Sequence, residues 1–269
     1  MHKSEVLKSS DNKKIKELQQ LSKKKNRQAK KMYVVEGIRF VESAVEKKVA
    51  LIDVFYSSDL LKNERGHALI NMVAQTGCRL HEVLPKLFDS ISDTVNSQGV
   101  LAIAPMEAQV SLLKMDDKPS LSLILDRIQD PGNLGTIIRT ADAAGIKDII
   151  LVKGTTDPYN SKVLRSTMGS IFDVRFHFME TDEVIDYMHH QGIRIVVTAL
   201  EATHYYYELS VEEPLSLVIG NEGNGVSEAF MEAANDLIKI PMYGGAESLN
   251  ASIAAGIVLY DCAIRQRNL

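Results

Sequence analysis

The chain has 269 residues, long enough for two ordinary domains; 45% of its residues are hydrophobic, 25% are charged, and its formal net charge at pH 7 is −4. No apolar run approaches the roughly 20 residues that a membrane-spanning helix needs, and the polar N-terminus lacks the apolar core of a secretory signal. The only cysteines, Cys78 and Cys262, show no metal-binding spacing. We therefore expect a soluble protein of a reduced, cytoplasmic compartment.

The positive charge of the chain is concentrated at its N-terminus. Residues 1–31 contain ten Lys and Arg27 against three acidic residues, a net charge of +8, so the other 238 residues carry −12. Local clusters of positive charge bind phosphate groups, which makes this segment a candidate contact for nucleic acid. A solvated basic helix without a partner explains the same charge pattern equally well.

Helix and strand patterns alternate over about the first 105 residues, which predicts a small α/β domain. The segment 12–31 begins as a helix, because Ile15, Leu18 and Leu21 recur at a spacing of three, and then becomes too basic to bury. The elements expected next are an apolar segment at 33–37, a helix at 38–48, a strand at 51–57, a helix at 67–77 and strands at 78–84 and 99–104.

The polar segment 106–119 is the expected linker, and it is followed by a second pattern. We accordingly divide the chain into an N-terminal domain at 1–105 and a C-terminal domain at 120–269. Near-continuous apolar runs in the second domain predict a parallel sheet covered on both faces. A last helix, at roughly 248–265, is apolar on most sides and carries small residues, so we expect it to be buried in the core or against another subunit.

Three turns of the C-terminal domain place polar residues at predicted strand ends. The segment 123–139, LILDRIQDPGNLGTIIR, leads from a strand through an Asp-Pro-Gly-Asn turn into a helix that carries Arg139. The segments GNEGNG at 220–225 and ESLNASIAAG at 247–256 repeat this pattern. Open α/β sheets build their sites at the carboxyl ends of their strands, so the three turns predict one assembled site.

With these motifs, the C-terminal half resembles the SpoU/TrmH branch of the SPOUT superfamily, RNA 2′-O-ribose methyltransferases that use S-adenosylmethionine. The motifs occur in order at 130–145, 218–227 and 240–261, and the resemblance covers about residues 121–265. It implies a parallel-sheet SPOUT domain with a trefoil knot, and a homodimer. The N-terminal half is similar to the L30e-like substrate-binding domain that is often attached to such enzymes.

The resemblance also implies the catalytic residues. It gives Arg139 the role of activating the ribose 2′-hydroxyl. Because arginine stays protonated, we favour phosphate binding and polarisation of the hydroxyl over true general-base action. The residues that would orient the hydroxyl are Asn133, Glu222, Ser248 and Asn250. Read by themselves, Asn133 and Ser248 could equally be helix caps.

By the same resemblance, S-adenosylmethionine is the cofactor. The residues implied to contact it are Ala199, Leu200, Gly220, Ile240 and Leu249. We expect no metal, because the sulfonium already supplies a good leaving group and the pair His189 and His190 has no third ligand. We interpret Asp126 and Asp130 as structural residues.

The expected function is therefore S-adenosylmethionine-dependent methylation of a ribose 2′-hydroxyl in structured RNA, with 23S ribosomal RNA favoured as the substrate. Two alternatives stay open: a transfer RNA 2′-O-methyltransferase, and a non-catalytic RNA-binding protein with the same fold. A nucleotide-dependent oxidoreductase is disfavoured, since the glycines at 220–225 do not follow the G-x-G-x-x-G order.

Overall fold

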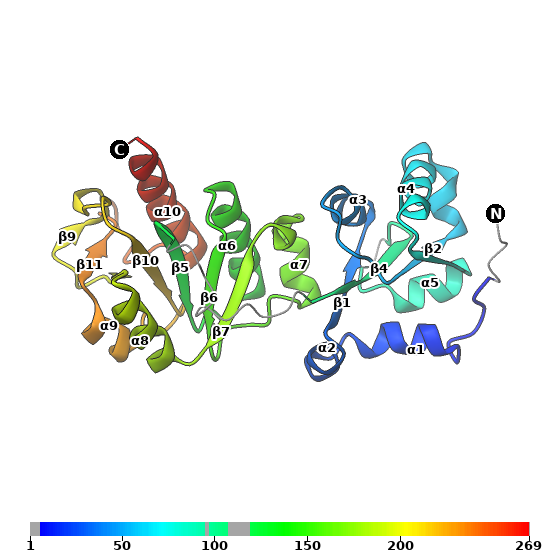
Figure 1. Cartoon of the computed structure of the whole chain (residues 1–269), viewed down its shortest axis with the longest axis horizontal. Coiled ribbons are helices and arrows are strands. Elements are labelled where there is room, and N and C mark those ends of the chain that lie inside the picture. The colour runs from blue at the N-terminus through cyan, green and yellow to red at the C-terminus, as the bar shows by residue number, and fades with distance from the viewer. Residues whose placement is uncertain (1–5, 95–96, 107–118, 269) are drawn as a thin grey trace. The chain divides into compact units, whose positions relative to one another are not determined.

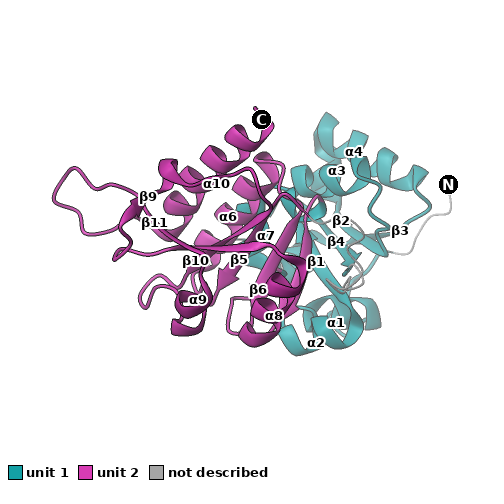
Figure 2. Ribbon diagram, turned by 60° about the vertical axis from the view of Figure 1, so that its left-hand side comes forward, with its two compact units in different colours: residues 1–108, 159–172 teal, residues 109–158, 173–269 magenta. Residues whose placement is uncertain are grey.

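The computed structural model describes residues 6–94, 97–106 and 119–268, so nearly all of the predicted linker lies outside the described residues. The chain forms two compact units (Figure 2). Unit 1 comprises residues 1–108 and 159–172, and unit 2 comprises residues 109–158 and 173–269. Among the described residues, no helix has the length and apolar character needed to cross a lipid bilayer.

Unit 2 is built on a seven-stranded sheet in which every pair of neighbouring strands is parallel, as the apolar runs predict. The strand order is β7-β6-β5-β10-β8-β11-β9. All six residues of β5 and all five of β6 are buried, which places these strands in the core. The strands are β5 (Leu121–Asp126), β6 (Asp148–Val152), β7 (Arg175–Met179), β8 (Arg194–Thr198), β9 (His204–Tyr205), β10 (Leu215–Gly220) and β11 (Asp236–Lys239).

Helices cover both faces of this sheet, as expected for buried parallel strands. Figures 1 and 2 show α6 (Pro131–Ala143) and α10 (Ala251–Arg267) on one face, and α8 (Thr181–Gln191) and α9 (Glu228–Ala233) on the other. A short 3-10 helix, η4 (Tyr206–Glu208), follows β9. The α/β class and the parallel sheet are confirmed, whereas the trefoil knot stays a prediction.

Unit 1 contains a four-stranded sheet of order β1-β4-β2-β3, in which only β2 and β3 are parallel. The strands are β1 (Met32–Glu36), β2 (Asp53–Ser57), β3 (Arg79–Val83) and β4 (Val100–Pro105). The helices are α1 (Lys13–Gln20), α2 (Lys24–Lys30), α3 (Ile38–Glu46), η1 (Ser58–Lys62), α4 (Glu64–Gln75), α5 (Pro85–Ile91), α7 (Ser161–Thr167) and η3 (Ser170–Phe172). A small α/β unit is thus present at the N-terminus.

The segment 159–172 packs within unit 1, although it follows the whole first domain in sequence. The ring of Tyr159 lies 4.7 Å from that of Tyr33, and the ring of Phe172 lies 5.2 Å from that of Phe40. These centroid distances are typical of packed aromatic pairs. The predicted domain limits, 1–105 and 120–269, stay a prediction.

The basic N-terminal segment forms two helices, because the chain turns between Leu21 and Lys23. The side chains of Ile15, Leu18 and Leu21 are buried in unit 1, as their spacing predicts. Arg27 is 95% buried, and its Nη1 donates hydrogen bonds to the carbonyl oxygens of Leu21 and Ser22. Arg27, one of the positive charges of this basic segment, therefore stabilises the fold.

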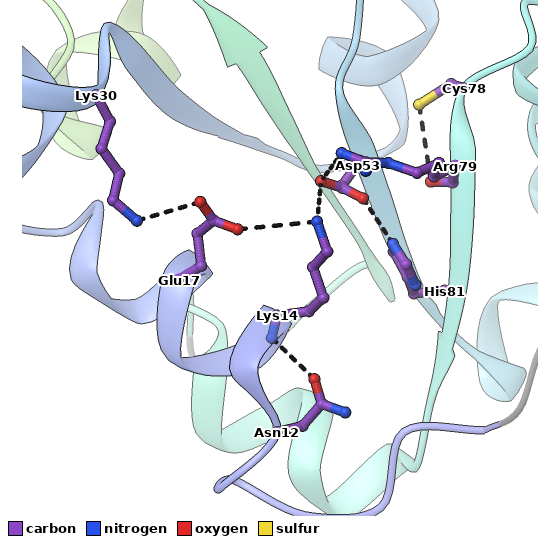
Figure 3. A network of polar contacts seen from close by, with 8 residues as sticks. All are labelled: Asn12, Lys14, Glu17, Lys30, Asp53, Cys78, Arg79 and His81. Carbon is purple, nitrogen blue, oxygen red and sulfur yellow. Dashed lines mark hydrogen bonds and ion pairs between the residues drawn. The ribbon is translucent and has the colours of Figure 1, made fainter.

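Asp53 holds α1 against the sheet through an ion-pair network (Figure 3). Its carboxylate lies 3.0 Å from Nζ of Lys14, 2.9 Å from Nη2 of Arg79 and 2.7 Å from Nε2 of His81. Burial raises the pKa of Asp53, but the hydrogen bonds from His81 and Lys14 outweigh it, so the pKa lies below its ordinary value. Asp53 is therefore ionised at neutral pH.

The same arrangement recurs in unit 2. Asp148 begins β6 and is opposite Arg175, which begins β7. The carboxylate of Asp148 accepts hydrogen bonds from Nε and Nη2 of Arg175 at 2.9 and 2.6 Å, and lies 2.8 Å from Nε2 of His177. Each unit thus has an Asp at the start of one strand, held by the first and third residues of its parallel neighbour.

Candidate active site

The first motif forms a turn between β5 and α6. Asp130 is the N-cap of α6, and its side chain accepts a hydrogen bond from the backbone amide of Asn133 at 2.8 Å. Pro131 occupies the first helical turn, where the missing amide hydrogen costs nothing. The cap therefore fixes Asn133 in the first turn of α6, and Asp130 has the structural role that we inferred from the sequence.

Glu222, from the second motif, binds this turn with both carboxylate oxygens. One oxygen accepts hydrogen bonds from the backbone amide of Asp130 at 3.1 Å and from Nδ2 of Asn133 at 3.0 Å. The other accepts one from the backbone amide of Gln129 at 3.0 Å. Burial raises the pKa of Glu222, but these hydrogen bonds outweigh it and the pKa lies below its usual value. Glu222 is therefore a carboxylate at neutral pH.

The third motif joins the same network through Asn250. Nδ2 of Asn250 donates a hydrogen bond to Oδ1 of Asn133 at 2.9 Å. Asn250 is also the N-cap of α10, where its Oδ1 accepts hydrogen bonds from the backbone amide and the hydroxyl of Ser252. One amide side chain, that of Asn133, thus connects all three motifs.

Two predicted catalytic residues lie outside this network. Arg139 is exposed on α6, six residues after Asn133. Within the described part of the chain its guanidinium has no hydrogen-bond or ion-pair partner, so all its donors are available to a ligand. Ser248 is exposed in the loop between β11 and α10, and it does not cap α10, because Asn250 does.

Four of the five predicted cofactor residues lie at the carboxyl edge of the unit 2 sheet. Ala199 and Leu200 directly follow β8, Gly220 ends β10, and Ile240 directly follows β11. β8 lies between β10 and β11 in the sheet, so these three strand ends are neighbours. Leu249 lies in the loop before α10.

The exposure of the cofactor residues differs among them. Leu200 is 63% and Leu249 36% exposed, whereas Ala199 and Ile240 are half-buried. Gly220 has a packing role of its own, since a Cβ there would lie 2.3 Å from the backbone of Gly225. The edge therefore offers exposed apolar side chains next to a tightly packed turn.

A second set of contacts supports the site through Asp126, which the sequence indicated as structural, although its partners were not predicted. The fully buried carboxylate of Asp126, at the end of β5, accepts a hydrogen bond from the backbone amide of Ser227 at 2.6 Å and binds the side chain of Arg127. Nδ2 of Asn221 donates to the carbonyl oxygen of Arg127 at 2.8 Å. These contacts connect the first and second motifs. The one signal in the sequence is an acidic residue at the end of an apolar run.

The described residues include no group of three or more His, Cys, Asp or Glu side chains that could hold a metal ion. The polar groups of the three motifs are the side-chain amides of Asn133 and Asn250, the accepting carboxylate of Glu222 and, further along α6, the exposed guanidinium of Arg139. Such a set binds anions and hydroxyl groups and can orient a sugar next to a phosphate.

Comparison with known proteins shows which family model each half of the chain matches. The SpoU rRNA Methylase family model matches residues 120–260, and the MRM3-like substrate binding domain model matches residues 12–102. The chain is 33% identical over 256 residues to the 23S rRNA (guanosine(2553)-2′-O)-methyltransferase RlmP of Bacillus subtilis, covering 94% of this chain and 97% of the relative. It is 33% identical to the 23S rRNA (guanosine-2′-O-)-methyltransferase RlmB of Vibrio parahaemolyticus, over 86% of this chain and 96% of the relative.

Solved structures agree with these relatives. An rRNA methyltransferase from Sinorhizobium meliloti superposes with a TM-score of 0.86 at 31% identity, covering 97% of this chain and 98% of that protein. Its AdoMet-bound form superposes with a TM-score of 0.85. The family model spans the region of the three motifs, and the relatives and solved structures cover nearly the whole chain, so the chain belongs to the SpoU rRNA methylase family.

Proposed function

We propose that this protein transfers a methyl group from S-adenosylmethionine to a ribose 2′-hydroxyl of 23S ribosomal RNA. The observation that carries the proposal is the hydrogen-bonded chain from Glu222 through Asn133 to Asn250, which joins the three family motifs. The exposed guanidinium of Arg139 lies on the same helix as Asn133, six residues further on. The relatives named for 23S ribosomal RNA span almost the full length of this chain, which supports the same substrate class.

In this proposal the residues of the chain bind a phosphate of the RNA, orient the target ribose and polarise its 2′-hydroxyl. Arg139 binds a phosphate next to the target ribose through its planar fork and polarises the 2′-hydroxyl, since a guanidinium stays charged at any working pH. Glu222 already accepts three hydrogen bonds from the protein, so it acts by fixing Asn133. Asn133 and Asn250 then hold the sugar in line for attack, which lowers the entropic cost of the reaction.

The carboxyl edge of the unit 2 sheet fits S-adenosylmethionine. Leu200 and Leu249 supply exposed apolar surface for an adenine ring, and the backbone after β8, β10 and β11 supplies hydrogen-bonding groups. When bound, the cofactor supplies an electrophilic methyl group on a sulfonium. We assign Ala199, Leu200, Gly220, Ile240 and Leu249 to its binding, and Ser248 to the orientation of the reacting groups.

We further propose that the enzyme is a homodimer that works on ribosomal RNA in the cytoplasm. An apolar stripe on α10 supports the dimer: Ile253, Tyr260 and Ile264 are 53%, 41% and 53% exposed, and Ile257 lies between them. Their spacing of four, three and four residues places them on one face of the helix. Exposed apolar stripes of this kind mark protein interfaces.

A methyl-transfer assay tests the catalytic proposal. The full-length protein is incubated with tritiated S-adenosylmethionine and either an unmodified 23S ribosomal RNA transcript or total transfer RNA. We expect label in the 23S transcript and, for Arg139→Ala, a loss of about 10²–10³-fold in rate, as for the removal of one group that stabilises a transition state. The control is Lys147→Ala, which removes an exposed cation near the end of α6.

The position of the label is read from reverse-transcription stops at low deoxynucleotide concentration. Label in transfer RNA alone would support the transfer RNA alternative. An unlabelled 23S transcript, or an Arg139→Ala variant as fast as the wild type, would contradict the proposal. Calorimetric binding of S-adenosylmethionine to the variant shows whether its cofactor site is intact.

A further inference from the structure

Unit 1 contains a cavity of about 820 Å³ that no family motif of the methyltransferase half explains. Its walls are the first turn of α3, the helix η1, the chain before β4 and the helix α7 with Met168. The volume lies within the roughly 300–1,000 Å³ of pockets that bind small molecules or single building blocks of polymers. The cavity is therefore large enough for one nucleotide.

Arg165, on α7, lines this cavity with an incomplete set of hydrogen bonds. Its Nη1 is buried and has no hydrogen-bond partner among the described residues. A buried charged donor without an acceptor is costly, and such groups in native proteins call for an explanation. An acceptor that arrives with a ligand, such as a phosphate oxygen, would satisfy Nη1.

The charged side chains around the cavity include two arginines that have no ion-pair partner in the described ranges. Arg65 is paired with Glu42, and Asp59 with Lys62. The other two acidic residues of the lining accept hydrogen bonds: Glu36 from Thr94 and its neighbours, and Asp89 from the hydroxyl of Ser97. By contrast, the exposed Arg39 and the half-buried Arg165 have no carboxylate partner in the described ranges. Two such groups favour a phosphate as ligand.

The start of α3 adds to this positive potential. Gly37, which has no side chain, is the N-cap of this nine-residue helix, and Oε1 of Gln98 accepts a hydrogen bond from the first-turn backbone amide of Ile38 at 2.8 Å. The positive end of the helix dipole thus faces the wall that also carries Arg39. A negative ligand gains from both the helix terminus and the guanidinium groups.

The remaining wall is apolar. Leu60 and Phe40 are buried against it, and Met168 is 57% exposed. Methionine side chains adapt to flat ring surfaces, which they contact through a polarisable sulfur. A bare anion would leave this apolar surface unused, whereas a base attached to a phosphate would cover it.

We infer that this cavity binds one unpaired nucleotide of the RNA substrate, with its phosphate on Arg39 and Arg165 and its base against Met168. The inference rests on the proposed function, since it names the part of the RNA that unit 1 recognises. Proteins read RNA sequence mainly through unpaired bases that leave the helix, so one such pocket would select the site of modification.

Binding of an unmodified 23S ribosomal RNA transcript to the full-length protein tests this inference. We expect Arg165→Ala and Arg39→Ala each to weaken binding about tenfold and to lower the slope of log affinity against log salt by about one. Arg165→Lys keeps the charge but loses the planar fork, so it should lie between Arg165→Ala and the wild type. The control is Lys86→Ala, an exposed cation on α5 outside the cavity, with less than a twofold change.

Chemical probing of the transcript supplies a second measurement. The wild type should protect one unpaired nucleotide that becomes reactive again with Arg165→Ala. If Arg165→Ala does not fold, as judged by thermal unfolding, the exposed Arg39→Ala carries the test. Adenosine 5′-monophosphate and inorganic phosphate serve as competing probes for a free small ligand.

The outcomes separate this inference from the proposed function. If the wild type methylates the transcript but all cavity variants bind RNA as it does, the inference is wrong and the proposed function stands. If adenosine 5′-monophosphate or phosphate binds through Arg165 while RNA affinity is unaffected, the cavity holds a small ligand and the inference is again wrong. If the wild type neither binds nor methylates the transcript, both fall.

Discussion

Both carboxylate oxygens of Glu222 are occupied by groups of the protein. A carboxylate in this glycine-rich loop suits either ordering of the site's arginine or contact with a hydroxyl or cationic group. The observed contacts are instead to Asn133 and to the backbone amides of Gln129 and Asp130, so Glu222 orders the turn before α6. The carboxylate of the second motif thus stabilises the turn that the first motif forms.

We expect the support from Glu222 to depend on pH. The pKa of Glu222 is lowered in the folded protein, so its stabilising effect is present above the unfolded-state pKa of about 4.3 and is lost as the pH falls through the lower, folded-state pKa. Glu222→Gln removes one acceptor and should loosen the turn by about 1–2 kcal/mol at pH 7. Hydrogen-exchange protection at the amides of Gln129 and Asp130 measures this. The exposed Glu201→Gln is the control, and equal protection in both variants would contradict the prediction.

Gly220 offers a steric prediction at the same scale. A Cβ at Gly220 would lie 2.3 Å from the backbone of Gly225 and Val226, so Gly220→Ala must displace the second motif. We expect a loss of about 1–3 kcal/mol of stability, as for other overpacked positions. Gly223→Ala, in the same loop, is the matched control, because a Cβ there meets only an ordinary contact at 3.6 Å. Urea unfolding compares the two; a similar midpoint for both would show that the loop adapts.

At the scale of elements, the two Asp clusters have one function in two different sheets. Asp53 and Asp148 each begin a strand, and each is paired in register with an Arg at the start of its parallel neighbour. A buried carboxylate is tolerated only with such partners. The clusters therefore fix the register at the amino ends of the strands, while the candidate active site occupies the carboxyl ends in unit 2.

We expect Asp148→Asn to lower the free energy of unfolding by about 1–3 kcal/mol at pH 7, since it breaks contacts to Arg175 and His177. The pKa of Asp148 is lowered in the folded protein, so the stabilisation is present above about pH 3.9 and disappears as the pH falls further. Urea unfolding at pH 7 and pH 3 should show the difference between variant and wild type shrink. The exposed Asp182→Asn should change stability by at most about 0.5 kcal/mol; a constant difference at both pH values would refute the role of the charge.

Much of the element pattern could be predicted from sequence, because apolar runs are a local signal. The buried strand β5 includes the strand predicted at the start of the segment 123–139, and Ile15, Leu18 and Leu21 are buried as their spacing predicts. The break between α1 and α2 was not predicted, since it depends on Arg27, whose side chain binds the carbonyl oxygens at the end of α1. Such a contact across a turn does not change the periodic spacing of apolar residues in the sequence.

The residues of the candidate site could be predicted from the sequence, but the hydrogen bonds among them could not. Motif resemblance named Asn133, Glu222 and Asn250, and the structure joins them by hydrogen bonds. It could not tell that Ser248 and Arg139 lie outside this network, or that Asp126 supports it, because these facts depend on distances between residues far apart in the chain.

At the scale of the whole molecule, the proposed dimer gives a prediction. Introducing charge into the stripe of α10 with Ile253→Lys and Ile264→Lys should convert a dimer into monomers, because a buried lysine without a partner is costly. Sedimentation velocity measures the change. Leu84→Lys, at a 40% exposed apolar position in unit 1, is the control and should leave the dimer intact. A monomeric wild type would contradict the proposal.

The packing of residues 159–172 within unit 1 has a consequence for biosynthesis. A nascent chain that has emerged from the ribosome only as far as residue 106 still lacks Tyr159 and Phe172, the aromatic partners of Tyr33 and Phe40. Domains commonly fold in order of their synthesis, N-terminal first. Here the first unit cannot be completed until β5, α6 and β6 of the second have already been translated, so the order of synthesis interleaves the two units.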